Sequence, residues 1–232
     1  MPPKAAPVRM SLDEVMSALA ANGTAQNIKI YQRHGGIMPM FGVSSAFLKE
    51  LAKKIKRDAP LAAALWATGN YDAMNLAAMI ADPSLFTEGE ADAWLQSVRC
   101  YAAAGSLANV VAASPVALSR VQAWTKSPDE YTRTTGYDTL CVMLRQGAAL
   151  DDAWLADVIR TIEAEIGGSA NRARHAMNMA LIAIGGYRAA LRDQVLAAAA
   201  RIGPVMVDHG ETSCETPEVG PYIAKMVARG RV

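Results

Sequence analysis

The sequence predicts an all-α fold made of stacked antiparallel helix pairs. Four tryptophans, Trp66, Trp94, Trp124 and Trp154, follow one another at intervals of 28, 30 and 30 residues. A period of about 30 residues is the length of one helix-turn-helix unit and is typical of stacked repeats. Helix caps and breakers recur along the chain, and alanine supplies much of its apolar content, which lets helices approach closely. A stacked repeat offers a long open surface, so function is expected there rather than in a closed cleft.

Caps and breakers place the helices of the first half. Ser11 and Glu14 are spaced as a capping box, which predicts a helix that ends at Asn22-Gly23. A second helix is expected from about Thr24 to Arg33, before Gly35-Gly36. A third is capped by Ser44 or Ser45; its apolar stripe is Phe47, Leu48, Leu51, Ala52 and Ile55. The following helices are expected at about residues 61–68, 71–81, 88–102 and 105–113.

Prolines and glycines divide the second half, at Pro115, Pro128 and Gly167-Gly168. The most strand-like segment of the chain is Pro204–Asp208. About twelve helices with short joints, and no low-complexity linker, predict one domain. We expect a disordered tail at residues 1–10, repeats over 11–203, and an extension at 204–232 packed on the same domain. Helices of this half are expected at about residues 115–126, 128–146, 151–166, 170–185, 188–202 and 219–229.

Composition narrows the classes of function. The net charge of +1 gives no global attraction to nucleic acid or membranes, so any polyanion site depends on local clustering. The three cysteines, Cys100, Cys141 and Cys214, lie far apart without a CxxC motif, which favours a reducing cytoplasm over a disulfide framework. The start of the chain has no apolar signal region, and no stretch of 18 apolar residues occurs, so neither a secretory signal nor a membrane span is expected.

Two basic clusters in the first half are candidate phosphate sites. Arg33 and His34 close a helix before a glycine turn and could bind phosphate; basic residues also favour this end of a helix because of its dipole. The run Lys49–Arg57 carries five cations, Lys53 and Lys54 among them, with Glu50 as its only acid. Phosphate binding and a solvated outer helix face explain this run equally well.

Two segments of the second half concentrate polar groups. Within Asn171–Asn178, Arg172 and Arg174 stand near a helix N-terminus against the preference of the helix dipole, which favours an anion site. In the other segment, Asp208, His209 and Cys214 are residue types that bind metals, but their spacing matches no metal motif, and a loop histidine is more often a hydrogen-bonding group. We therefore expect no metal and no cofactor. No hydrolytic triad or phosphate-binding glycine loop occurs either.

Three strings resemble the DNA alkylation repair (AlkD-like) family: Tyr31-Gln-Arg-His-Gly35, the segment 41–56 that begins Phe-Gly-Val-Ser, and the segment 61–72 around Trp66. Trp124 with Arg133, and then Asn171–Asn178, follow in the family's order, so the resemblance covers about residues 28–203. It implies a right-handed superhelix of HEAT-like repeats that holds duplex DNA on its concave face. Active members release N3- and N7-alkylated purines; a carboxylate that follows a tryptophan on a central helix stabilises the oxocarbenium-like sugar, and a later arginine and a second tryptophan complete the site.

This chain departs from that pattern at the carboxylate. No Asp or Glu occurs from residue 93 to residue 128, and Arg99–Gly105 stands where the tryptophan and acid are expected, with Tyr101 as its only aromatic residue. The position of the second tryptophan falls near Asn178-Met179. Of the family's site residues, only the arginine has a counterpart in this sequence, Arg133. No catalytic residue is therefore assigned.

We expect a bacterial, cytoplasmic, nucleoid-associated protein that holds double-stranded DNA, alkylated or distorted, without the family's glycosylase chemistry. One alternative is an active alkylpurine glycosylase with a displaced acid, drawn from Asp129, Glu130, Asp138 or Asp208. Another is a HEAT scaffold that binds a protein partner. The residues expected to contact nucleic acid are Arg33, His34, Lys53, Lys54, Arg99, Tyr101, Arg133, Arg172, Arg174 and His175.

Overall fold

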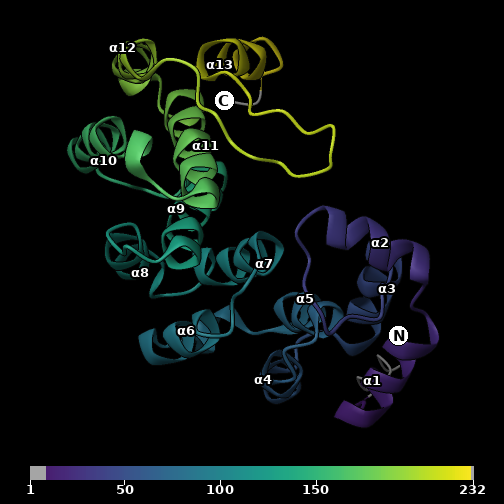
Figure 1. Cartoon of the computed structure of the whole chain (residues 1–232). Coiled ribbons are helices and arrows are strands. Elements are labelled where there is room, and N and C mark those ends of the chain that lie inside the picture. Colours follow the sequence, from purple (N-terminus) through teal and green to yellow (C-terminus); the bar gives the residue numbers. More distant parts are fainter. Residues whose placement is uncertain (1–8, 231–232) are drawn as a thin grey trace. The chain divides into compact units, whose positions relative to one another are not determined.

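The computed structural model describes residues 9–230, and in this range the chain is helical (Figure 1). Residues 9–230 contain thirteen α-helices and three short 3-10 helices, and the one β-bridge in this range, between Gly23 and Val43, is isolated. The all-α class is confirmed, and Pro204–Asp208 forms no strand. Residues 1–8 of the expected tail lie outside the described range. The chain forms two compact units, divided after Pro115, and the domain boundaries given above stay a prediction.

Unit 1, the part up to Pro115, begins as the caps predict. The Ser11 hydroxyl accepts a hydrogen bond from the Glu14 N–H, and the Glu14 carboxylate accepts one from the Ser11 N–H, so the capping box is confirmed. Thr24 and Ser44 cap the next two helices through their hydroxyl groups. The helices of this unit are α1 (Leu12–Ala21), α2 (Ala25–Arg33), α3 (Ser45–Ile55), α4 (Ala59–Ala67), α5 (Tyr71–Ile80), η1 (Pro83–Leu85), α6 (Glu88–Leu95) and α7 (Tyr101–Ala112).

Unit 2, the part from Val116 onward, alternates two layers of helices. In Figure 1, α8, α10 and α12 lie on one side of this unit and α9, α11 and α13 on the other. The longest helices, α9 and α11, pack directly against each other. The helices of this unit are α8 (Ala117–Trp124), α9 (Glu130–Arg145), α10 (Asp152–Glu165), η2 (Ile166–Gly168), α11 (Asn171–Tyr187), η3 (Ala189–Leu191), α12 (Arg192–Ile202) and α13 (Val219–Ala228).

The tryptophan period marks successive helix pairs. Trp66, Trp94, Trp124 and Trp154 lie in α4, α6, α8 and α10, and each of these helices packs on the helix that follows it. In unit 1 the Trp66 and Trp94 rings stack with centroids 4.4 Å apart, and the Trp66 Nε1–H donates to the Trp94 carbonyl oxygen at 3.0 Å. In unit 1 one large ring thus joins neighbouring helix pairs.

The single helix predicted over 88–102 is wrong, because the chain leaves the helix at Gln96 and starts α7 only at Tyr101. The Arg99 guanidinium donates to the carbonyl oxygens of Gln96 and Val98 at 2.6 and 2.9 Å, which satisfies groups that the helix end exposes. Val98 is buried at the same turn. No glycine or proline marks this break, so helix periodicity continues across it in the sequence.

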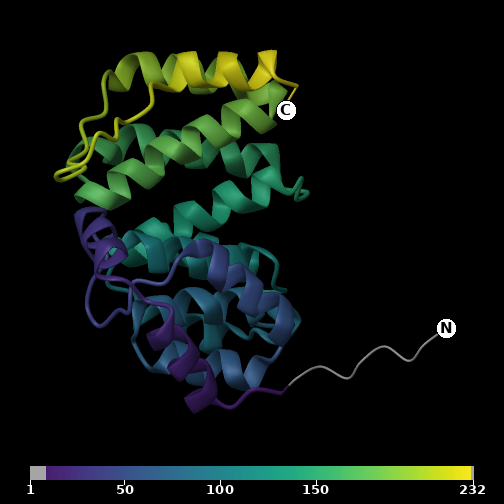
Figure 2. The same cartoon turned by 90° about the vertical axis from the view of Figure 1, so that its right-hand side faces the viewer.

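Glycines on α11 allow α13 to pack closely. A Cβ atom at Gly185 would stand 2.5 Å from Ile223 Cδ1, and one at Gly186 would stand 2.4 Å from Met226 Cε. In Figure 2 the helices of unit 2 are seen lengthwise, with the segment before α13 passing beside one end of them. Within residues 9–230, no helix is long and apolar enough to cross a membrane.

Candidate nucleic-acid interface

The loop between α2 and α3, residues 34–44, carries the first predicted cations at its start. Arg33 is exposed at the last turn of α2, and His34 is half-buried at its C-cap. Neither residue forms an ion pair within the described chain. The sequence from Val15 to Lys49 contains no Asp or Glu at all. Arg33 and Lys29, one helical turn before it, therefore lie in a locally positive region.

A buried carboxylate holds this loop in place. Asp72 of α5 accepts the backbone N–H groups of Phe41, Gly42 and Val43 at 2.7, 3.0 and 2.9 Å. Gly42 has a φ of 79°, and a Cβ atom there would stand 2.4 Å from the Thr24 carbonyl oxygen. The motif Phe41-Gly-Val-Ser is thus explained by the closing of this loop onto α5, a role for Asp72 that sequence reasoning missed.

The basic face of α3 is solvated. Its predicted apolar stripe is buried at Leu48, Leu51 and Ile55, which leaves the lysines outside. Lys54 pairs with Glu50 at 3.2 Å, and such an exposed pair contributes little to stability. Within the described residues, Lys53 forms no ion pair. Lys53, like Lys49 and Lys56, is therefore an exposed cation of this cluster that can contact a phosphate.

Three tyrosines gather where α2, α5 and α7 meet in unit 1. The rings of Tyr31 and Tyr71 lie 5.4 Å apart, and the Tyr31 hydroxyl donates to the Val43 carbonyl oxygen at 2.7 Å. Burial raises the pKa of Tyr71, and nearby Cys100, Tyr101 and Tyr31 raise it further, so the Tyr71 phenol stays protonated at neutral pH. Tyr101 thus lies beside Tyr71 at the start of α7. The family string had included Tyr31, but only the tertiary packing joins it to the other two.

The half-exposed face of α7 carries no charge. Its solvent-facing residues are Tyr101, Ala102, Gly105, Ser106 and Asn109. The Ser106 hydroxyl donates to Asn75 Oδ1 of α5 at 2.6 Å, which continues a neutral polar surface onto that helix. Arg99, predicted to bind phosphate near this face, uses its guanidinium to close α6.

In unit 2, Arg133 is committed to internal contacts. Its guanidinium donates to the Ser127 carbonyl oxygen at 2.7 Å and lies 3.1 Å from Glu165 Oε2, and its side chain is only 17% exposed. It also donates to Ser169 Oγ at 3.2 Å. Arg133 therefore ties the start of α9 to the turn before α11.

The basic N-terminus of α11 is neutralised from outside the helix. Glu130 of α9 accepts the Arg172 backbone N–H at 2.7 Å, so a carboxylate occupies the position that the helix dipole favours. Arg174 donates to the carbonyl oxygens of Ser169 and Met206, both at 2.9 Å. The apparent conflict between these arginines and the helix dipole is thus resolved within unit 2 itself.

The segment 203–218, here called the strap, runs along the N-terminal half of α11. Asn171 and Asp208 exchange two hydrogen bonds of 2.8 and 2.7 Å between the Asn171 amide and the Asp208 backbone. The His175 ring lies edge-on to His209, with centroids 5.5 Å apart. Burial lowers the pKa of His175, and His209 and Arg172 lower it further, so this imidazole is neutral at pH 7. The polar cluster of α11 therefore serves mainly to anchor the strap.

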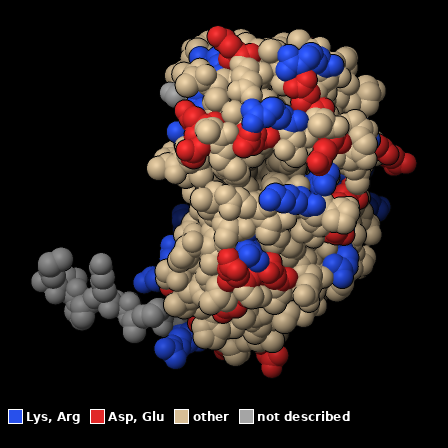
Figure 3. Space-filling view, turned by 90° about the vertical axis from the view of Figure 1, so that its left-hand side faces the viewer, with Lys and Arg blue, Asp and Glu red and all other residues tan. Residues whose placement is uncertain are grey.

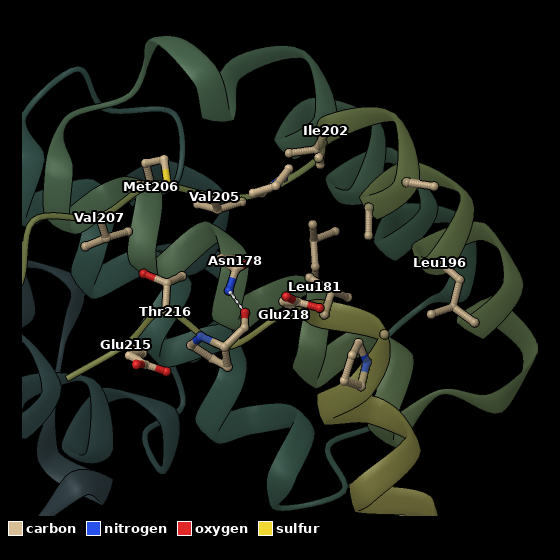
Figure 4. A pocket seen from close by; sticks show the side chains of 18 of the residues that line it. Asn178, Leu181, Leu196, Ile202, Val205, Met206, Val207, Glu215, Thr216 and Glu218 are labelled. Atoms are coloured by element: carbon tan, nitrogen blue, oxygen red, sulfur yellow. Dashed lines mark hydrogen bonds between the residues drawn. The ribbon is translucent and has the colours of Figure 1, made fainter. Parts of the chain in front are cut away.

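Beneath the strap lies an apolar cavity of about 630 Å³ (Figure 4). Leu181, Leu196 and Val205 are among its lining residues, and the Asn178 side chain donates to the Pro217 carbonyl oxygen across it at 2.9 Å. Asn178, near which the family's second tryptophan is expected, is thus buried under the strap. Within residues 9–230 no three metal-binding side chains converge. Asp208 accepts the Gly210 N–H instead, and Cys214 is exposed.

Of the four acids that are candidates for a displaced catalytic group, three have structural partners. Asp129 caps α9 through the Thr132 N–H, and Glu130 and Asp208 accept backbone N–H groups as described above. Asp138, in the middle of α9, is half-buried and has no hydrogen-bond partner in the described chain. Burial raises the pKa of its carboxyl to about 7. A desolvated, accessible carboxyl of this kind can act as an acid at neutral pH.

Charges of both signs are interspersed on the face drawn in Figure 3, and no extended basic area forms on it. On α10, Arg160 pairs with Asp157, and Arg201 of α12 pairs with Glu163 of α10. These two pairs neutralise cations of the α10–α12 layer. On α2 and α3, Lys29, Arg33, Lys49 and Lys53 are exposed and form no ion pair within residues 9–230, so they can contact a polyanion.

Relatives of this chain are bacterial. It is 27% identical over 229 residues to an uncharacterized protein of Listeria innocua, and 25% identical over 228 residues to one of Listeria monocytogenes. Each comparison covers 96% of this chain and 99% of the relative. No function accompanies either of these names.

A solved structure matches nearly the whole chain. It has a TM-score of 0.87 and 30% sequence identity, covers 96% of each chain, and is described as a new family of proteins related to the HEAT-like repeat DNA glycosylases with affinity for branched DNA structures. The HEAT-like class of the fold is thereby confirmed, while the handedness of a superhelix stays a prediction. The sequence profile described as DNA alkylation repair enzyme matches residues 15–210. The chain therefore belongs to the DNA alkylation repair family.

Proposed function

We propose that this protein binds distorted or branched double-stranded DNA without excising alkylated bases. The observation that carries the proposal is the neutral face of α7. This helix lies where the family's central acid is expected, yet residues 93–128 contain no Asp or Glu. Tyr101, Ala102 and Gly105 lie on its half-exposed face. Without a carboxylate there, an oxocarbenium-like sugar has no anionic stabilisation from this helix.

Affinity for DNA would come from phosphate contacts of unit 1. Arg33, Lys29 and Lys53 are exposed and form no ion pairs within residues 9–230. Contacts of this kind position a protein on DNA without reading its sequence. The matched solved structure, whose description names affinity for branched DNA, supports a preference for DNA shape over a particular lesion.

Titration of the full chain against labelled DNA tests this function. A four-way junction, a linear duplex of the same sequence and a single strand are compared at several salt concentrations. The junction is expected to bind tightest, and its affinity to fall as salt rises, because bound phosphates release counterions. Equal affinity for all three DNAs, or the absence of binding at low salt, would contradict the proposal.

The matched variants for this titration are Arg33→Ala and Arg160→Ala. Both arginines are exposed, but Arg160 pairs with Asp157, whereas Arg33 is unpaired in the described chain. Only Arg33→Ala is expected to weaken junction binding. In parallel, methylated DNA incubated with the wild-type chain is expected to release no more 7-methylguanine than it does with a heat-killed sample.

The alternative of an active glycosylase rests on Asp138. Its unpartnered carboxyl with a pKa of about 7 could stabilise a developing positive charge when ionised. If methylated purines are released, Asp138→Asn decides the assignment. If the variant no longer releases methylated purines but still binds DNA, this second function is supported. Unchanged release would show that Asp138 is not the catalytic acid.

A further inference from the structure

The α2–α3 loop exposes two large apolar side chains at its apex. Ile37 is 41% exposed and Met38 is 56% exposed, whereas Met40, two residues further on, is buried. This loop therefore has a distinct inner and outer side, and the pair Ile37 and Met38, called the apex below, lies on the outer one. Packing within unit 1 does not explain why these two apolar side chains are exposed.

The backbone on both sides of the apex is fixed by hydrogen bonds. The Gly36 N–H donates to the Tyr31 carbonyl oxygen at 2.7 Å, and the Pro39 carbonyl oxygen accepts the Tyr71 N–H at 2.9 Å. Further along, Asp72 holds the three N–H groups from Phe41 to Val43. An apex held in this way has little conformational entropy to lose when it binds a partner.

The charge around the apex favours a polyanion. The stretch 15–49 contains no acid, and Lys29 and Arg33 precede the apex on successive turns of α2. Asp72, the carboxylate that holds this loop, is fully buried and surrounded by N–H donors. An apolar tip beside cations is the combination by which proteins insert a side chain between bases and hold the flanking phosphates.

We infer that Ile37 and Met38 form a wedge that enters the open base step at a DNA branch point while Arg33 and Lys29 hold the adjoining phosphates. This inference rests on the proposed DNA-binding function and adds the part of the surface that would read DNA shape. Opening a stacked step in a linear duplex costs about a few kcal/mol, whereas stacking is already interrupted at a branch point. A protein partner fits less well, because two side chains offer far less than the roughly 800 Å² per partner of a stable protein interface.

The test uses a four-way junction with 2-aminopurine at the branch point, because the fluorescence of this base rises when it unstacks. Wild-type protein is expected to raise the fluorescence on binding. The double variant Ile37→Ser/Met38→Ser is expected to bind the junction through the same cations but to lose the rise. Leu85→Ser is the matched control, since Leu85 is also an exposed apolar residue of unit 1, at 59%, and should keep the wild-type signal.

Other outcomes would overturn the inference. The wedge inference would be wrong if the bound wild-type chain left the fluorescence unchanged, or if the double variant kept the full rise. The proposed DNA binding would still hold in both cases. Absence of binding to any of the DNAs removes the proposed function and the wedge together. A wild-type dimer that the double variant converts to a monomer, with unchanged fluorescence, would assign the apex to protein contact instead.

Discussion

The α2–α3 loop of unit 1 and the N-terminal half of α11 in unit 2 use similar residues in opposite ways. Both carry arginine and histidine at a helix end. In unit 1, Arg33 remains exposed and unpaired in the described chain, because a buried Asp72 fixes the loop through backbone N–H groups. In unit 2, Arg174 donates to two carbonyl oxygens and anchors the strap. A basic cluster is therefore available for a ligand only where other groups hold the fold together.

Two carboxylates, the buried Asp72 and the half-buried Asp138, extend this comparison. Asp72 accepts three backbone N–H groups, whereas Asp138 has no hydrogen-bond partner among residues 9–230. Asp72 should therefore stabilise the fold, and Asp138 should reduce stability wherever it is ionised.

The largest expected effect is that of Asp72→Ala. It leaves three backbone N–H groups without an acceptor, two of them in buried hydrogen bonds, and is expected to lower the free energy of unfolding by about 3 to 5 kcal/mol. Chemical denaturation measures this loss. Asp13→Ala, an exposed acid in the first turn of α1, is the control and should change stability by less than about 1 kcal/mol. Similar losses in both variants would mean that Asp72 does not fix the loop.

Asp138→Asn should show a strong dependence on pH. The pKa of Asp138 is raised in the folded chain from 3.8 to about 7. The folded state is therefore most stable, as far as Asp138 is concerned, below pH 3.8, and this stability is lost as pH rises through 7. The neutral amide avoids that loss, so the variant should exceed wild type by up to about 4 kcal/mol at pH 8 and by less at pH 5. Denaturation curves at both pH values measure the difference. A difference that does not change with pH would show that Asp138 is not desolvated.

Arg133→Ala separates structural from DNA-binding arginines. The change leaves Glu165 without its partner and removes the hydrogen bond to the Ser127 carbonyl oxygen, so a loss of about 2 to 3 kcal/mol in the free energy of unfolding is expected. Below its unfolding temperature the variant should bind a junction as wild type does. Weaker binding by a fully folded variant would show that Arg133 belongs to the DNA-binding surface.

Arg33→Ala should give the reverse result, with the smallest change in stability. Because Arg33 is exposed, the free energy of unfolding should change by less than about 0.5 kcal/mol. Junction affinity should fall, and the slope of log affinity against log salt should decrease by about 1, because one phosphate contact is lost. An unchanged salt slope would place Arg33 outside the interface.

Local physics determined what the sequence could predict. Hydroxyl and carboxylate caps, apolar stripes and the tryptophan period depend on neighbours within a few turns, so the sequence alone predicts α1, α2, α3 and the succession of helix pairs. The family resemblance likewise follows from short strings of residues. The missing acid between residues 93 and 128 was visible for the same reason.

Only the tertiary structure decided which charged groups remain available. Asp72 meets its donors about thirty residues earlier in the chain, and Arg174 meets the Met206 carbonyl oxygen 32 residues later. At the break before α7, the Arg99 guanidinium folds back onto the carbonyl oxygens of Gln96 and Val98. A side chain in the sequence shows its charge but not its partner, and the partner determines whether that charge stabilises the fold or is left for DNA.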